Sequence, residues 1–115
     1  MMIIDAHTHI FPDKNAATIL QATAKMFNVP TFGAATAGDL LEKMDSCGIS
    51  HAVIHMVSPT PSGVIDTNTW LIKLQQDRFI KFGTLHPGFI AHLMASLLSA
   101  LGPQRAGDVP KPGGA

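Results

Sequence analysis

Apolar segments alternate with amphipathic segments along residues 1–89, and the alternation predicts the secondary structure. Three short apolar or β-branched runs read as strands, at about residues 2–8, 51–57 and 79–85. The segments between them show helical spacing and predict helices at about residues 14–27, 37–47 and 64–76. Parallel neighbours need a crossover of a dozen residues or more, which these helices supply. The pattern therefore predicts an α/β fold with three neighbouring parallel strands and helices outside the sheet.

Local signals support the helices. Asp13 is expected to cap the first helix, and Pro30 ends its pattern. Thr36, with Asp39 three residues later, resembles a capping box for the second helix, and Gly48 is placed to end it.

The predicted helices also carry apolar stripes. These are Leu40, Leu41, Met44 and Cys47 in the second helix and Trp70, Leu71 and Leu74 in the third. Both stripes are expected to face the core.

The first strand carries the candidate chemistry. Alternation along a strand places Asp5, His7 and His9 on one face, so both imidazoles could reach a single ion. Imidazole suits zinc, iron, nickel or copper. Asp5 could itself be a ligand, or it could orient a ligand histidine.

The pair has a simpler explanation, since two surface histidines on an edge strand would look the same in sequence. Two features favour a metal site. Residues 2–4, at the start of the strand, are continuously apolar, as in a strand buried on both faces. His7 and His9 also lie at the C-terminal end of the strand, where α/β folds place their sites.

The segment MIIDAHTHIFP at residues 2–12 resembles the start of amidohydrolase-superfamily proteins, which are metal-dependent hydrolases and decarboxylases on a (β/α)8 barrel. Residues 40–49 and 78–87 fit the same family, in its amidohydrolase-related branch. The resemblance covers about residues 2–89. It implies that His7 and His9 bind a catalytic divalent metal, most simply zinc, and that a full-length enzyme acts on a small molecule. Asp5 and His86 are expected to orient the metal ligands or to contact the substrate.

The length of the chain limits this expectation. A (β/α)8 barrel needs at least ~200 residues, so 115 residues hold about the first three βα units. The family's remaining ligands come from later strands, and the chain alone is expected to be inactive. A truncated or frame-shifted product is favoured over a genuine short protein. The alternative function is an inactive remnant, or an interaction module that pairs through exposed barrel edges.

Other histidines and aromatic residues have competing explanations. His86 follows the third strand, where βα loops begin, but a lone histidine is more often structural. His51 and His55 are expected to be structural. Phe11 and Phe32 could line a substrate pocket, although packing beneath a loop is favoured.

Composition narrows the function classes. The net charge is zero with neutral histidines, which gives no electrostatic reason to expect nucleic acid or an anionic membrane as partner. The single Cys47 excludes an internal disulfide and is expected to be a small apolar residue at a helix end. No targeting segment is visible and the longest apolar stretch is too short to span a bilayer, so a cytoplasmic protein is expected.

The sequence changes character after residue 89. Residues 90–101 contain an apolar segment that could form a short helix at about 91–101, and the Gly- and Pro-rich residues 102–115 are expected to be a disordered tail. A partial barrel exposes strand edges and an apolar sheet face, so the chain is expected to self-associate or aggregate.

Overall fold

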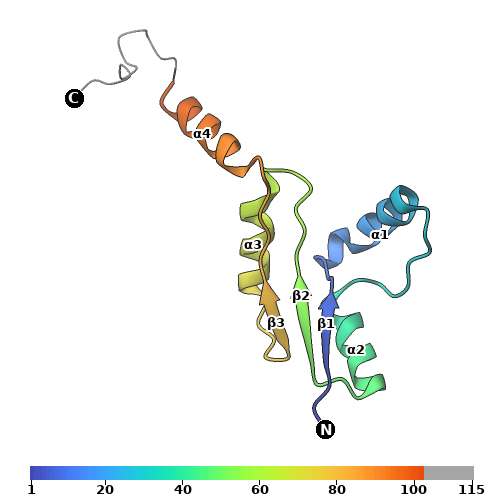
Figure 1. Ribbon diagram of the computed structural model, residues 1–115. Coiled ribbons are helices and arrows are strands. Elements are labelled where there is room, and N and C mark those ends of the chain that lie inside the picture. Colours follow the sequence, from blue (N-terminus) through green and yellow to red (C-terminus); the bar gives the residue numbers. More distant parts are fainter. Residues whose placement is uncertain (103–115) are drawn as a thin grey trace.

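A three-stranded parallel sheet organises the chain, as shown in a computed structural model that describes residues 1–102 (Figure 1). The strands are β1 (Ile4–Thr8), β2 (His51–His55) and β3 (Phe79–Phe82), in the order β1-β2-β3. Both pairings are parallel. The α/β class and the parallel neighbours are thus confirmed, although each strand is shorter than predicted. The predicted tail lies outside the described residues from position 103 onward.

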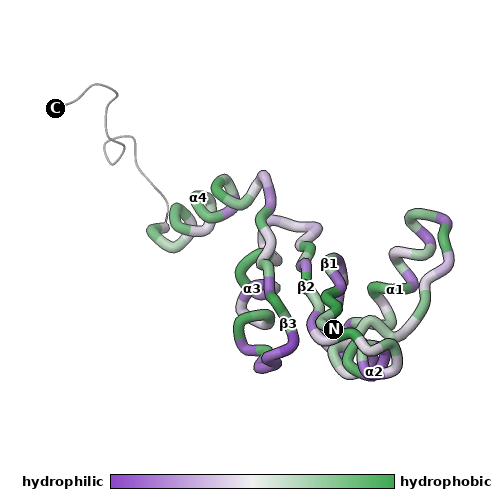
Figure 2. The backbone as a smooth tube through the Cα atoms, turned by 60° about the horizontal axis from the view of Figure 1, so that its bottom comes forward, coloured by the Kyte–Doolittle hydropathy of each residue, from purple (hydrophilic) through white to green (hydrophobic). Residues whose placement is uncertain are grey.

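Helices follow each strand. They are α1 (Asp13–Phe27), α2 (Ala37–Cys47), α3 (Gly63–Lys73) and α4 (Phe89–Ala100). Met44 of α2 and Leu71 of α3 belong to one core cluster with β2, so both helices cover the same face of the sheet. The helix α4 projects beyond the C-terminal ends of the strands (Figures 1 and 2). The bounds of α2 match the prediction, while α3 ends earlier than predicted, at Lys73.

The helix termini follow the predicted chemistry in α2 but not in α1. The Thr36 hydroxyl accepts the backbone N–H of Asp39 at 3.1 Å, and Gly48 adopts the left-handed conformation with φ 70°. The prediction that Asp13 caps the first helix is wrong, because Pro12 occupies the N-cap position and Asp13 is already the first helical residue. The carboxylate of Asp13 instead lies in the first turn, where its negative charge interacts favourably with the positive end of the helix dipole.

The core lies between the sheet and the helices that cover one of its faces. Ala52 and Ile54 of β2 and Met56 directly after it occupy alternate positions and are all buried, as expected for side chains on a covered face. The rest of the core cluster is Ile10, Met44, Leu71 and Phe79, with Leu40, Leu41, Trp70 and Leu74 packed against it.

This core confirms most of the predicted helix stripes. Cys47 is the exception, because it lies exposed at the end of α2.

The opposite face of the sheet is uncovered within residues 1–102. The register pairs Ile4 with His51 and His55 with Phe82, positions that alternate with the buried residues of β2. Ile4 is 46% exposed and Phe82 is 54% exposed. In the described chain β1 is therefore not buried on both faces, because only the helical side has side chains packed on it, and the sheet has the exposed apolar face expected of a partial barrel.

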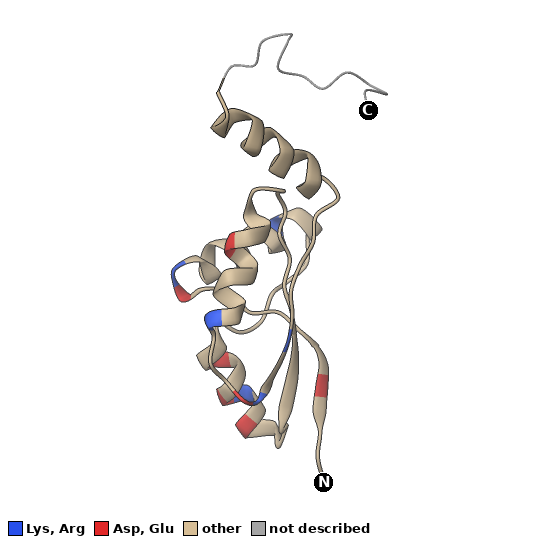
Figure 3. Ribbon diagram, turned by 90° about the vertical axis from the view of Figure 1, so that its left-hand side faces the viewer, with Lys and Arg blue, Asp and Glu red and all other residues tan. Residues whose placement is uncertain are grey.

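The last helix stands apart from this core. None of its residues is buried, and it carries no charged side chain (Figure 3). The radius of gyration is 19.8 Å, compared with about 13 Å for a compact domain of about 100 residues. In residues 1–102 no helix combines the length and the apolarity needed to cross a membrane.

Candidate metal centre

A β-bulge in β1 decides where the candidate residues point. Asp5 pairs with Ala52 and Thr8 pairs with Ile54, so β1 contains one more residue than β2 between these pairs. Such an insertion interrupts the ladder and re-aims the neighbouring side chains. The simple alternation predicted to place Asp5 on the face of both histidines is therefore broken. Asp5 and Thr8 both lie beside residues of the covered face, and His7 and His9 flank Thr8 on the other face.

The rings of His7 and His9 converge on that uncovered face. Their Nε2 atoms lie 3.1 Å apart, and the ring centroids lie 4.9 Å apart. Two nitrogens that bind one tetrahedral zinc at about 2.0–2.1 Å would lie about 3.3 Å from each other. The donor atoms are therefore spaced as a shared ion requires, after a shift of a few tenths of an ångström.

The hydrogen bond of His9 prepares its ring for coordination. The His9 Nδ1 atom lies 2.7 Å from the carbonyl oxygen of His55. Because a carbonyl can only accept, Nδ1 carries the proton and the neutral ring leaves Nε2 with a free lone pair. Metal-binding histidines commonly donate their second ring nitrogen to a carbonyl in this way.

The same 3.1 Å separation also suits a hydrogen bond between the two rings. In that state Nε2–H of His7 donates to Nε2 of His9, because the His9 proton is already on Nδ1. To bind a metal ion through Nε2, neutral His7 would have to carry its proton on Nδ1 instead, as His9 already does.

Asp5 contacts the backbone of the site. Its Oδ1 accepts the backbone N–H of His7 at 3.2 Å. A hydrogen bond between an Asp side chain and the backbone N–H two residues later is typical of a local turn. Asp5 thus holds the main chain at His7, whereas sequence reasoning considered it as a ligand or as a partner of a histidine ring.

His55 joins the pair, although sequence reasoning assigned it a structural role. Its ring centroid lies 4.7 Å from that of His7 and 6.3 Å from that of His9. Its Nε2 lies 3.1 Å from the carbonyl oxygen of Ala6 and therefore donates to it. The ring also stacks on Phe82, with centroids 5.7 Å apart and planes 10° apart. The available signal was its position at the C-terminal end of β2, next to the end of β1.

His86 and His51 make separate contacts. The Nδ1 atom of His86 accepts the backbone N–H of Gly88 at 3.0 Å, at the start of α4. No hydrogen bond or ring contact of His86 reaches His7 or His9 within the described chain. His51 lies at the N-terminal end of β2, and its Nδ1 is buried without a hydrogen-bond partner. Within residues 1–102 no group of three or more His, Cys, Asp or Glu side chains is arranged to hold a metal ion.

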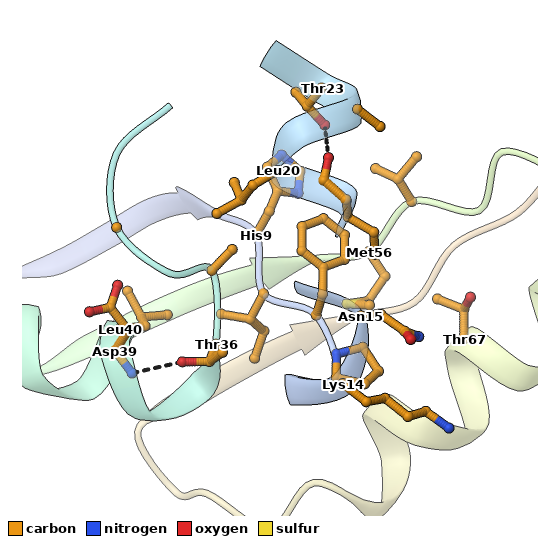
Figure 4. A pocket seen from close by; sticks show the side chains of 18 of the residues that line it. His9, Lys14, Asn15, Leu20, Thr23, Thr36, Asp39, Leu40, Met56 and Thr67 are labelled. Atoms are coloured by element: carbon orange, nitrogen blue, oxygen red, sulfur yellow. Dashed lines mark hydrogen bonds between the residues drawn. The ribbon is translucent and has the colours of Figure 1, made fainter. Parts of the chain in front are cut away.

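An open hollow of about 1330 Å³ lies next to His9 (Figure 4). Its walls come mainly from α1, the start of α2 and the segment after β2, and most of the lining side chains are apolar. Phe11 and Phe32 both line it. Phe32 is 89% exposed, so it does not pack beneath a loop. Of the histidine pair, His9 lines this hollow and His7 does not.

No protein-family model, curated protein or solved structure matches this chain. The interpretation of the site therefore depends on its residues and their geometry.

Proposed function

We propose that His7 and His9 form part of a divalent-metal site, with zinc as the preferred ion, in a hydrolase or decarboxylase of the amidohydrolase type. The three parallel strands would correspond to the first three strands of a (β/α)8 barrel. The observation that supports this proposal is the convergence of two imidazole Nε2 atoms at 3.1 Å, with His9 held in the tautomer that leaves Nε2 free.

A bound zinc ion would lower the pKa of a coordinated water to about 7 and polarise a carbonyl or carboxylate group. His9 contributes a lone pair whose direction is set by the carbonyl of His55. His7 contributes a second, with its backbone held by Asp5. The apolar hollow beside His9 would bind and partly desolvate a small organic substrate.

The described residues supply an incomplete coordination sphere. Catalytic zinc sites usually take about three protein ligands, and residues 1–102 hold no group of three. The chain by itself should therefore bind zinc weakly and should not turn over substrate. Further ligands would have to come from another segment or chain.

A second candidate function is an interaction module. The uncovered face of the sheet, with Ile4 and Phe82 exposed, favours it. In that case the histidine pair would be a hydrogen-bonded surface feature, and zinc would not be needed.

Calorimetric titration with Zn²⁺ tests the metal site. The double variant His7→Ala/His9→Ala should abolish the binding shown by the unaltered chain, because it removes both converging nitrogens. His92→Ala is the matched control, since His92 is exposed on α4 and far along the chain from the pair. If the double variant binds zinc as well as the control does, the metal assignment of β1 has to be abandoned.

A further inference from the structure

The bulge in β1 leaves backbone groups without ladder partners, and side chains take their place. The carbonyl of Ala6 accepts from the His55 ring, and the N–H of His7 donates to Asp5. On β2, the carbonyl of Val53 accepts the Thr8 hydroxyl at 2.8 Å. The irregular segment is therefore tied to β2 by specific side-chain bonds, which is the arrangement expected where a bulge aims a side chain.

His55 forms hydrogen bonds with one residue before His7 and with one residue after it. Its ring nitrogen Nε2 donates to Ala6, the residue before His7. Its carbonyl accepts from the ring of His9, two residues after His7. The ring itself packs against His7 at 4.7 Å, and Phe82 of β3 stacks on it. A single residue of β2 thus contacts the peptide before His7, the ring of His7 and the ring of His9.

We propose that His55 is a positioning residue for the His7–His9 metal pair, an inference that rests on the proposed function. By holding the Ala6 peptide, its imidazole fixes the bulge and so keeps Nε2 of His7 directed at Nε2 of His9. His55 does not act as a ligand. The three histidines do not form a three-ligand group within residues 1–102, and the Nε2 of His55 carries a proton that it donates to the Ala6 carbonyl.

Two variants separate the hydrogen bond from simple ring packing. His55→Phe keeps an aromatic ring that can stack on Phe82, but it has no N–H for the Ala6 carbonyl. His55→Gln loses the ring but keeps an N–H donor. The carbonyl of residue 55 that holds His9 is present in both variants, so only the side chain is tested. His51→Phe is the matched control on the same strand, because no ring contact or hydrogen bond links His51 with His7 or His9.

Zinc affinity is the first measurement. Loss of a residue that orients ligands typically lowers metal affinity about 10–100-fold. His55→Phe should show a loss of at least about tenfold, His55→Gln should stay within about threefold of the unaltered chain, and His51→Phe should be unchanged. Far-UV circular dichroism establishes that each variant is folded. If His55→Phe does not fold, His55→Leu, which also lacks a donor, is compared with His55→Gln: a tenfold loss in His55→Leu alone supports the proposal, and equal affinity of the two variants overturns it.

Nitrogen-15 NMR of the imidazole rings is the second measurement, made without metal. The His9 ring should be in the Nδ1–H form in the unaltered chain. In His55→Phe the His7 signals should shift towards tautomer-averaged values, because the bulge no longer directs its ring at His9, whereas the His9 ring should stay in the Nδ1–H form because the carbonyl of residue 55 is retained.

The failures are distinguishable. If the unaltered chain binds no zinc, the proposed function fails. If it binds zinc, and His55→Phe binds equally well with unchanged His7 signals, only the positioning role of His55 is refuted.

Discussion

Arg78 offers a sharp test of how the sheet is held together at the N-terminal ends of its strands. Its guanidinium donates from Nε to the carbonyl of Ser50 at 3.0 Å and from Nη2 to the carbonyl of Ile49 at 2.8 Å. Nη1 lies 2.7 Å from Oδ1 of Asp45 near the end of α2. One side chain before β3 thus joins the α2–β2 connection to the third strand, so Arg78→Ala should destabilise the sheet.

The size of the effect follows from these three bonds. Hydrogen bonds from a charged donor contribute about 1.5–3 kcal/mol each, and the Arg78 side chain is 32% exposed, so the lower end applies. An exposed ion pair adds about 0.2–1 kcal/mol, and Asp45 is mostly exposed. Arg78→Ala should therefore lower the free energy of unfolding by about 3 kcal/mol, most of it from the two carbonyl bonds.

Urea denaturation followed by far-UV circular dichroism measures this loss. With an m value of about 1.5 kcal/mol/M, the midpoint of Arg78→Ala should fall by about 2 M. Asp45→Ala removes the ion pair alone and should cost less than about 1 kcal/mol. Arg78→Lys should recover little, because an ammonium group cannot reproduce the planar fork of donors. If Arg78→Ala and Asp45→Ala had equal urea midpoints, the hydrogen bonds from Arg78 to the carbonyls of Ser50 and Ile49 would not be the main source of its contribution to stability.

The remaining predictions concern association and helix ends. The chain should self-associate, with a mass in multi-angle light scattering that rises with concentration, because Ile4, Phe82 and the apolar α4 are exposed; a monomer at every concentration would contradict this. Thr36→Ala removes the bond to the Asp39 N–H and should cost about 1 kcal/mol in urea denaturation, whereas Thr36→Ser should cost little. Gly48→Ala should cost about 1 kcal/mol because φ is 70° there, and an unchanged midpoint would mean that the helix end relaxes.

Local patterns in the sequence determined the elements and their order. The apolar runs are separated by helices that are long enough for the crossover that parallel neighbours need. The strands pair in that way, in the order β1-β2-β3. Thr36 and Gly48 mark the ends of α2 correctly because capping depends on residues within one turn. The apolar stripe of Trp70, Leu71 and Leu74 meets the core for the same reason, since its spacing is a property of the helix alone.

The site depended on contacts that no local pattern contains. Sequence spacing brought His7 and His9 together as candidates, but the register between β1 and β2 set the bulge that aims their rings and that broke the alternation with Asp5. His55 is far from the pair in sequence and becomes its neighbour only through strand pairing. His86, predicted to follow the third strand directly, lies four residues beyond the end of β3 and bonds locally at the start of α4 instead. Register and bulges arise from pairing between distant segments, so only the tertiary structure could decide which histidines meet.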